Sequence, residues 1–181
     1  MKWYGFVLIF LAATFFCDII YTFRLLVFSE TSLSVTDISL PDKELPILNR
    51  PNDAVLSART MPKQPLVLFF LASWCRPCRL EAPSIMKLSE RHDVPFIGIA
   101  VRDKEENLQR FLEQNGNPYS YIALDTDMVW TKAMNADKLP TAFVINAQGK
   151  AVAKINGIIT DEFYFKTLLP FLQELKNEKP L

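Results

Sequence analysis

Two continuous apolar runs, each about the length of one strand, constrain the fold of this chain most. They are PLVLFFLA at residues 65–72 and VPFIGIAV at residues 94–101. Strands that are apolar on both faces are typical of parallel sheets covered by helices. The segment between the runs, CRLEAPSIMKLSERH, has apolar residues at helical spacing and predicts such a helix. The central pattern is therefore strand, helix, strand.

The rest of the chain extends this alternation with turn signals in the expected places. KEENLQRFLEQNG predicts a second helix that ends at Asn115-Gly116, and TAFVINAQGKAVAKI predicts two strands joined by a turn containing Gly149. The other predicted elements are an edge hairpin or irregular cover at 41–65, a short strand at 121–124, a short helix at 128–134 and a last helix at 161–176. We therefore expect an α/β fold with a mixed central sheet covered by helices on both faces.

The length and charge of the chain limit its organisation and its partners. With 181 residues, 50% of them hydrophobic, the chain can form one ordinary domain and a small additional segment. Its 20 basic and 20 acidic residues give a net charge of zero, so there is no electrostatic basis for binding nucleic acid. We predict no nucleic-acid partner and expect partners to be selected by shape and local chemistry.

The N-terminal segment is apolar, with no charge from Trp3 to Cys17. A cleaved signal peptide, a lipoprotein signal ending at Cys17 and an uncleaved anchor are the three interpretations. Bulky residues follow Ala12 and Ala13, and the bulky Phe16 precedes Cys17, which favours the anchor. A helix over about 20 residues is long enough to cross a bilayer core of about 30 Å. We expect a transmembrane anchor at 1–28, a Ser/Thr-rich linker at 29–40 and the folded domain at 41–181.

Two cysteines, Cys75 and Cys78, lie in the stretch LASWCRPCRLEAP between the first strand and its helix. A structural zinc site needs about four ligands. The other candidates are Cys17, in the predicted anchor, and His92, which we interpret as a solvated residue near a helix end, so we predict no metal site. A static disulfide is a second interpretation, but so short a loop constrains the unfolded chain little. A redox dithiol is the interpretation that the spacing favours.

The expected helix explains how the two cysteines would differ in such a dithiol. Cys75 precedes the helix, where backbone N–H groups and the helix dipole favour a thiolate, so we predict that it attacks. Cys78 follows one turn later, where it can resolve a mixed disulfide. Pro77 is tolerated in a first helical turn, and Arg76 adds positive charge beside the nucleophile.

From about Leu45 to Leu175 the sequence resembles membrane-anchored, thioredoxin-fold disulfide reductases of the TlpA/DsbE (CcmG) type. The resemblance is carried by LFFLASWCRPCRLEAP, FLEQNGNPY and LPTAFVINAQGKAV. It implies a thioredoxin-like fold, a cis peptide bond at Leu139-Pro140 facing the dithiol, and protein-disulfide reductase activity without a cofactor. It further implies a place in cytochrome c maturation.

The resemblance also assigns roles around the dithiol. Glu81 corresponds to an acid of this branch that could move protons to or from Cys78, although a surface carboxylate is an equal interpretation. Phe69 occupies the position where many thioredoxins carry a buried acid. Trp74 would offer an apolar surface to the substrate or simply pack, and the backbone at Leu139, beside Pro140, would bind the substrate chain through strand-like hydrogen bonds.

The partners implied by the resemblance are oxidised apocytochrome c or its dithiol carrier, with a membrane thiol reductant as the electron donor. The implied location is the bacterial inner membrane, crossed once, with the catalytic domain facing the periplasm. Two other functions stay open from the sequence. The same dithiol could serve other clients, such as proteins of copper resistance, or two thiolates could bind Cu(I) in a metallochaperone.

Overall fold

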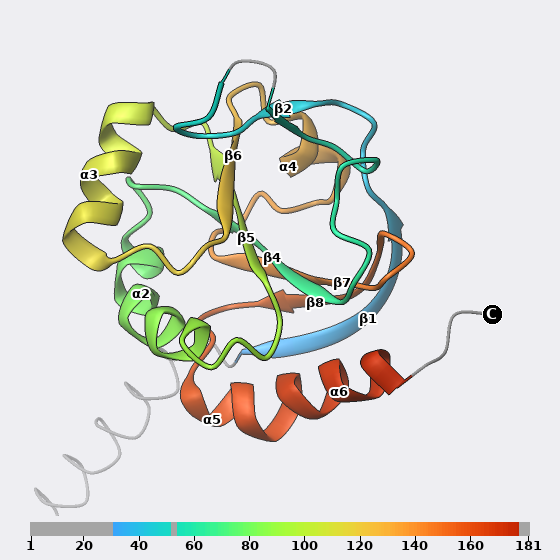
Figure 1. Ribbon diagram of the computed structural model, residues 1–181. Helices are drawn as coiled ribbons and strands as arrows, with labels where there is room; N and C mark the ends of the chain where they lie inside the picture. Colours follow the sequence, from blue (N-terminus) through green and yellow to red (C-terminus); the bar gives the residue numbers. More distant parts are fainter. Residues whose placement is uncertain (1–30, 52–53, 178–181) are drawn as a thin grey trace, which may run out of the picture. The chain divides into compact units, whose positions relative to one another are not determined.

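The computed structural model of the chain describes residues 31–51 and 54–177. Six strands form one mixed sheet in the order β1-β8-β7-β4-β5-β6, with β4, β5 and β6 parallel and β7 antiparallel to β4 (Figure 1). The strands are β1 (Ser32–Ser39), β4 (Leu66–Leu71), β5 (Phe96–Val101), β6 (Tyr121–Asp125), β7 (Thr141–Ile145) and β8 (Lys150–Asn156). The helical segments are α2 (Arg76–Ser89), α3 (Glu105–Asn115), α4 (Val129–Ala133), α5 (Asp161–Phe163), the π-helical η1 (Tyr164–Leu168) and α6 (Leu169–Asn177).

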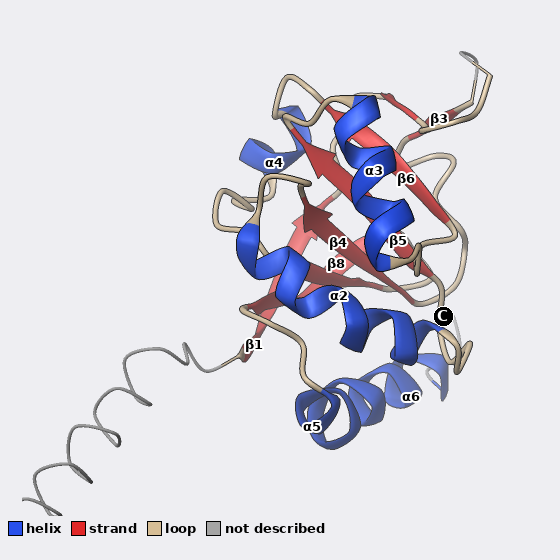
Figure 2. Ribbon diagram, turned by 90° about the vertical axis from the view of Figure 1, so that its left-hand side faces the viewer, coloured by secondary structure: helices blue, strands red, loops and turns tan. Residues whose placement is uncertain are grey.

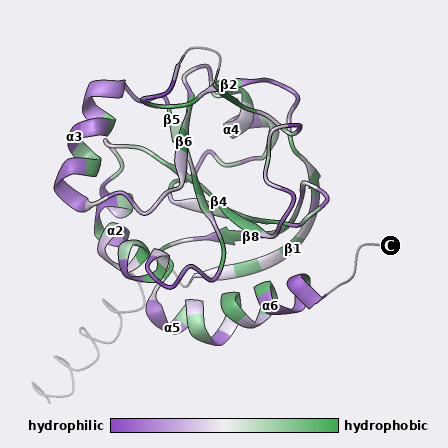
Figure 3. Ribbon diagram, viewed as in Figure 1, coloured by the Kyte–Doolittle hydropathy of each residue, from purple (hydrophilic) through white to green (hydrophobic). Residues whose placement is uncertain are grey.

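Helices cover both faces of this sheet, which confirms the predicted thioredoxin-like architecture. Successive side chains of β4 enter two separate apolar cores, because neighbouring strand residues point to opposite faces. Val67 and Phe69 pack in a core shared with α2, α3 and the C-terminal helices. Leu68 and Phe70 pack on the other face with α4 and residues 40–61. Figure 2 shows the helices around the sheet, and Figure 3 shows that β4 is hydrophobic and that α3 is largely hydrophilic.

The predicted hairpin between residues 41 and 65 is present as a small two-stranded sheet. It consists of β2 (Leu45–Pro46) and β3 (Val55–Leu56) in antiparallel pairing. The chain beyond β2 then lies along β6, where the Leu48 N–H donates to the Ile122 carbonyl at 2.8 Å. This cover satisfies backbone groups at the β6 edge of the main sheet.

The predicted linker at 29–40 is wrong over Ser32–Ser39, which forms the edge strand β1. This strand pairs antiparallel with β8, and Figure 1 shows the two running together. Polar composition suggested a tether, but backbone pairing with β8 does not require apolar side chains, and only Leu33 and Ile38 pack against the two cores. The folded domain therefore begins before residue 41.

The predicted membrane anchor at 1–28 lies outside the described residues. Within residues 31–51 and 54–177, no helix combines the length and the apolar character needed to cross a membrane.

Candidate active site

The two predicted redox cysteines lie at the N-terminus of α2 and form a disulfide with an S–S distance of 2.05 Å. Cys75 is the N-cap residue, and its Sγ accepts a hydrogen bond from the Cys78 backbone N–H at 3.1 Å. Pro77 lies in the first turn, where its missing N–H costs no helical hydrogen bond. This geometry places Cys75 where the helix N-terminus favours negative charge on sulfur.

Solvent exposure does not distinguish the two cysteines in the disulfide form. Cys75 is 4% exposed and Cys78 is 5% exposed. The difference between them is the capping hydrogen bond, which is received by Cys75 alone of the pair. The assignment of Cys75 as the attacking sulfur and Cys78 as the resolving one stays a prediction, with this bond in its favour.

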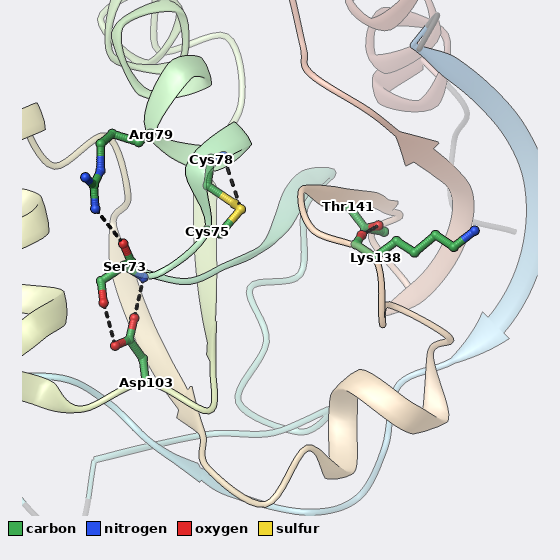
Figure 4. Close-up of a disulfide and its surroundings, with 7 residues drawn as sticks. All are labelled: Ser73, Cys75, Cys78, Arg79, Asp103, Lys138 and Thr141. Atoms are coloured by element: carbon green, nitrogen blue, oxygen red, sulfur yellow. Dashed lines mark hydrogen bonds between the residues drawn. A yellow bond between two sulfur atoms is a disulfide. The ribbon is translucent and has the colours of Figure 1, made fainter. Parts of the chain in front are cut away.

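Sheet topology brings the predicted proline to the same end of the molecule as the dithiol. Strand β4 leads into the cysteine loop, and its residue Phe70 pairs with Thr141, the first residue of β7. The peptide bond between Leu139 and Pro140 is cis, as the resemblance implied. The Thr141 hydroxyl donates to the Lys138 carbonyl at 2.5 Å across this turn. In Figure 4, Lys138 and Thr141 lie on one side of the disulfide, with the Lys138 amine pointing away from it.

Trp74 and Leu139 contribute to one surface pocket beside the dithiol. Trp74 is 60% exposed, which excludes the interpretation that it simply packs in the core. The pocket has a volume of about 370 Å³ and is lined by Trp74, Val101, Arg102, Met128, Asp137 and Leu139. Two of the three residues predicted to bind substrate, Trp74 and Leu139, therefore line one pocket although they are distant in sequence. The third, Pro140, directly follows Leu139.

Glu81 lies on the buried side of α2, so the interpretation as a surface carboxylate is wrong. Its side chain is one of three buried carboxylates among the described residues, with Asp103 and Asp125. Its Oε1 accepts a hydrogen bond from the Ile159 backbone N–H at 2.6 Å. Burial raises the pKa of Glu81 from 4.5 to about 8, and the Ile159 hydrogen bond opposes this rise. A carboxyl one helical turn after Cys78 is thus harder to ionise than an ordinary carboxyl.

Phe69, at the position where the resemblance expects a buried acid, is a buried aromatic residue of β4. The Phe69 ring contacts those of Phe96 and Tyr119 with centroid distances of 5.1 and 5.7 Å. Phe69, Cys75 and Cys78 belong to the same apolar core, and the Phe69 ring offers no proton acceptor there. Glu81 is the only carboxylate of α2, and it is therefore our candidate for proton transfer at Cys78.

His92 is exposed just beyond α2, as predicted. Among residues 31–51 and 54–177, no three His, Cys, Asp or Glu side chains are grouped so that they could hold a metal ion.

A buried cluster around Ser73 was missed from the sequence. Ser73 and Asp103 lie just beyond the carboxyl ends of β4 and β5, which are adjacent and parallel. The Ser73 backbone N–H and hydroxyl donate to Asp103 Oδ2 and Oδ1 at 2.5 and 2.7 Å. The acid after the second apolar run was the available signal, because residues at the carboxyl ends of neighbouring parallel strands meet at one edge.

The mixed sheet, the capped Cys-x-x-Cys pair and the cis-proline turn together define a thioredoxin-like protein with a redox-type cysteine site. The Redoxin family model matches residues 36–167, which is most of the chain. The chain belongs to the Redoxin family.

Two curated relatives support the DsbE-type resemblance. The thiol:disulfide interchange protein HelX of Rhodobacter capsulatus is 29% identical, over 57% of this chain and 58% of its own length. The DsbE homolog of Paracoccus denitrificans is 32% identical over 58% of each chain. The chain thus spans less than two thirds of the length of either relative.

A solved structure is similar at the level of fold. A secreted thiol-disulfide isomerase from Corynebacterium glutamicum superposes with a TM-score of 0.65, with 21% identity over 78% of this chain and 92% of that one. This likeness confirms the thioredoxin-like fold.

Proposed function

We propose that this protein is a thiol:disulfide oxidoreductase that reduces disulfides in other proteins. The observation that carries the proposal is the disulfide-forming pair Cys75–Cys78 at the N-terminus of α2, with Cys75 Sγ accepting the capping hydrogen bond. The relatives HelX and DsbE homolog, both thiol:disulfide interchange proteins by name, support the same reaction.

Reduction proceeds by two exchanges at sulfur, starting from the dithiol form. The Cys75 thiolate attacks one sulfur of the client disulfide, and the other client sulfur leaves as a thiolate and takes up a proton. Cys78 then loses its proton and attacks Cys75 Sγ, which releases the first client sulfur as a second thiol. Two electrons and two protons pass to the client, and the Cys75–Cys78 disulfide forms. A thiol reductant restores the dithiol.

Glu81 acts in the second exchange as the acceptor of the Cys78 proton. Its position three residues after Cys78 on α2 and its burial support this role. A carboxyl whose pKa is raised to about 8 is a stronger base when ionised than an ordinary carboxylate, although less of it is ionised at pH 7.

The client binds across the pocket beside the dithiol. The exposed Trp74 ring offers an apolar surface, and the backbone at Leu139, beside cis-Pro140, offers hydrogen bonds to an extended client segment. Pocket residues from four separate loops then fix the client cysteine near Cys75.

The proposed setting is the periplasmic face of a bacterial inner membrane, with residues 1–28 as a single-pass anchor. The uncharged segment from Trp3 to Cys17 supports the anchor. We propose oxidised apocytochrome c or its dithiol carrier as the client and a membrane thiol reductant as the electron donor. The support is the sequence resemblance to the DsbE (CcmG) branch.

A redox titration of residues 29–181 against glutathione, combined with reduction of insulin disulfides, tests the proposal. A potential well below the roughly −180 mV of disulfide isomerase, with insulin reduction, is the expected result. A potential near the roughly −120 mV of a strong oxidant overturns the reductase direction. Retention of stoichiometric copper without insulin reduction would instead favour the Cu(I) carrier.

A further inference from the structure

Asp103 holds the loop that carries the reactive cysteine. Its carboxylate, buried just after β5, accepts three hydrogen bonds. Two come from the backbone and hydroxyl of Ser73, at 2.5 and 2.7 Å, and the third comes from the Lys104 N–H at 2.9 Å. Two of these three hydrogen bonds therefore connect the β5–α3 loop to the residue two positions before Cys75.

Helix α2 holds the same loop from the other side. The Arg79 guanidinium donates to the Ser73 carbonyl at 2.9 Å. Figure 4 shows Asp103 and Arg79 meeting Ser73 from opposite sides, next to the disulfide. The Cys75 N–H also donates to the Ala72 carbonyl at 3.1 Å, which closes a turn around Ser73 and Trp74. The backbone leading into Cys75 is thus fixed by both neighbouring elements.

We propose that Asp103 is a positioning residue for thiol–disulfide exchange, acting through Ser73 to keep Cys75 Sγ at the N-terminus of α2. This inference rests on the proposed function. N-cap geometry requires extended backbone at the cap, and Cys75 has φ −81° and ψ 107°. Release of Ser73 allows Cys75 to leave this position and lose the Cys78 N–H bond, and the Cys75 thiolate then loses stabilisation.

The charge of Asp103 acts in the opposite direction, so the sign of the effect separates positioning from direct electrostatics. A nearby negative charge disfavours a thiolate, so removing that charge alone would favour it. Loss of positioning has the reverse effect. The charged and titratable groups that lie around the dithiol besides Asp103 are kept in the variant. They are Arg76, Arg79 and Glu81 of α2, Arg102 of the β5–α3 loop, and Asp137 and Lys138 before cis-Pro140.

The test is Asp103→Asn in the full-length chain, in a Cys78→Ala background that leaves Cys75 as the single site cysteine. Asn keeps the side-chain shape but cannot accept both the Ser73 N–H and the Ser73 hydroxyl as Asp does. Iodoacetamide labelling of the peptide containing Cys75, followed by mass spectrometry over a range of pH, gives the midpoint for thiolate formation. We expect this midpoint to rise by about 0.5 or more, which is about threefold less thiolate below the midpoint.

Asp125→Asn is the matched control. Asp125 follows the same pattern at the end of the next parallel strand, β6, where it is buried and accepts from two backbone N–H groups and the Thr131 hydroxyl. It lies away from Ser73 in this hydrogen-bond network, so we expect Asp125→Asn to lower the melting temperature without moving the Cys75 midpoint.

Ser73→Ala keeps the test decisive if Asp103→Asn fails to fold. It removes one of the two Ser73 bonds and should raise the midpoint by a smaller amount. A lowered or unchanged midpoint in the folded variants overturns the positioning role, because it leaves only a charge effect or a purely structural one. The labelling needs no client, so failure of the wild-type chain to reduce insulin would count against the proposed function without affecting this result.

Discussion

Glu81 makes the free energy of unfolding depend on pH in a way that Glu81→Gln should abolish. Burial raises the pKa of Glu81 from 4.5 to about 8 in the folded protein. Between these two values the folded protein keeps a proton on Glu81 that the unfolded chain has released. The folded state therefore binds more protons, and its stability falls as the pH rises through this window. Below it, Glu81 contributes no pH dependence.

The size of the effect follows from the width of that window. Each pH unit between the two pKa values corresponds to about 1.4 kcal/mol, so the span from 4.5 to about 8 corresponds to on the order of 5 kcal/mol. Gln has nearly the same shape, and its Oε1 can still accept the Ile159 N–H, but it carries no charge at any pH. The free energy of unfolding of Glu81→Gln minus that of wild type should therefore be larger at pH 8.5 than at pH 5. The increase should be of that order.

Urea unfolding of the oxidised protein at pH 5 and pH 8.5 measures this difference directly. Glu113→Gln, an exposed carboxylate on α3, is the control and should keep the wild-type pH dependence. The other titrating groups are common to all three proteins and cancel in the comparison. Parallel loss of stability in wild type and Glu81→Gln between the two pH values would refute the buried, proton-binding state of Glu81.

Three further predictions concern exchange and domain boundaries. Cys78→Ala should accumulate mixed disulfides with clients on non-reducing gels, because Cys75 still attacks and nothing resolves; equal trapping by Cys75→Ala would reverse the roles. In stopped-flow measurements, Glu81→Gln should form the Cys75 adduct at a near-normal rate but resolve it more slowly, and unchanged decay would remove the proton-acceptor role. A chain that lacks residues 1–28 and carries a cleavable export signal should still melt cooperatively and reduce insulin. Deletion of residues 1–40 should lower the melting temperature further, because it also removes β1. Equal melting temperatures of the two shortened chains would contradict a stabilising role of the β1–β8 pairing.

Much of the fold could be predicted because the elements around the dithiol depend on near neighbours in the chain. The apolar run at 65–72 became β4, and the helical spacing after Cys78 became α2. Helix α3 ends at Asn115 and is followed by Gly116, whose φ of 84° is readily adopted by glycine alone. The error at β1 has a different cause. Residues 32–39 are fixed by pairing with a strand more than 100 positions away, which a polar local composition does not reveal.

The sequence by itself determined the Cys75–Cys78 pair, its place before a helix and the strands that carry it, because spacing and periodicity act over a few residues. Only the tertiary structure decided the environment of that pair. Glu81 is buried through contact with Ile159, 78 residues away, and Ser73 is held by Asp103, 30 residues away. The sheet brings these partners together, and the electrostatics of a buried carboxylate depend on what surrounds it in space rather than along the chain.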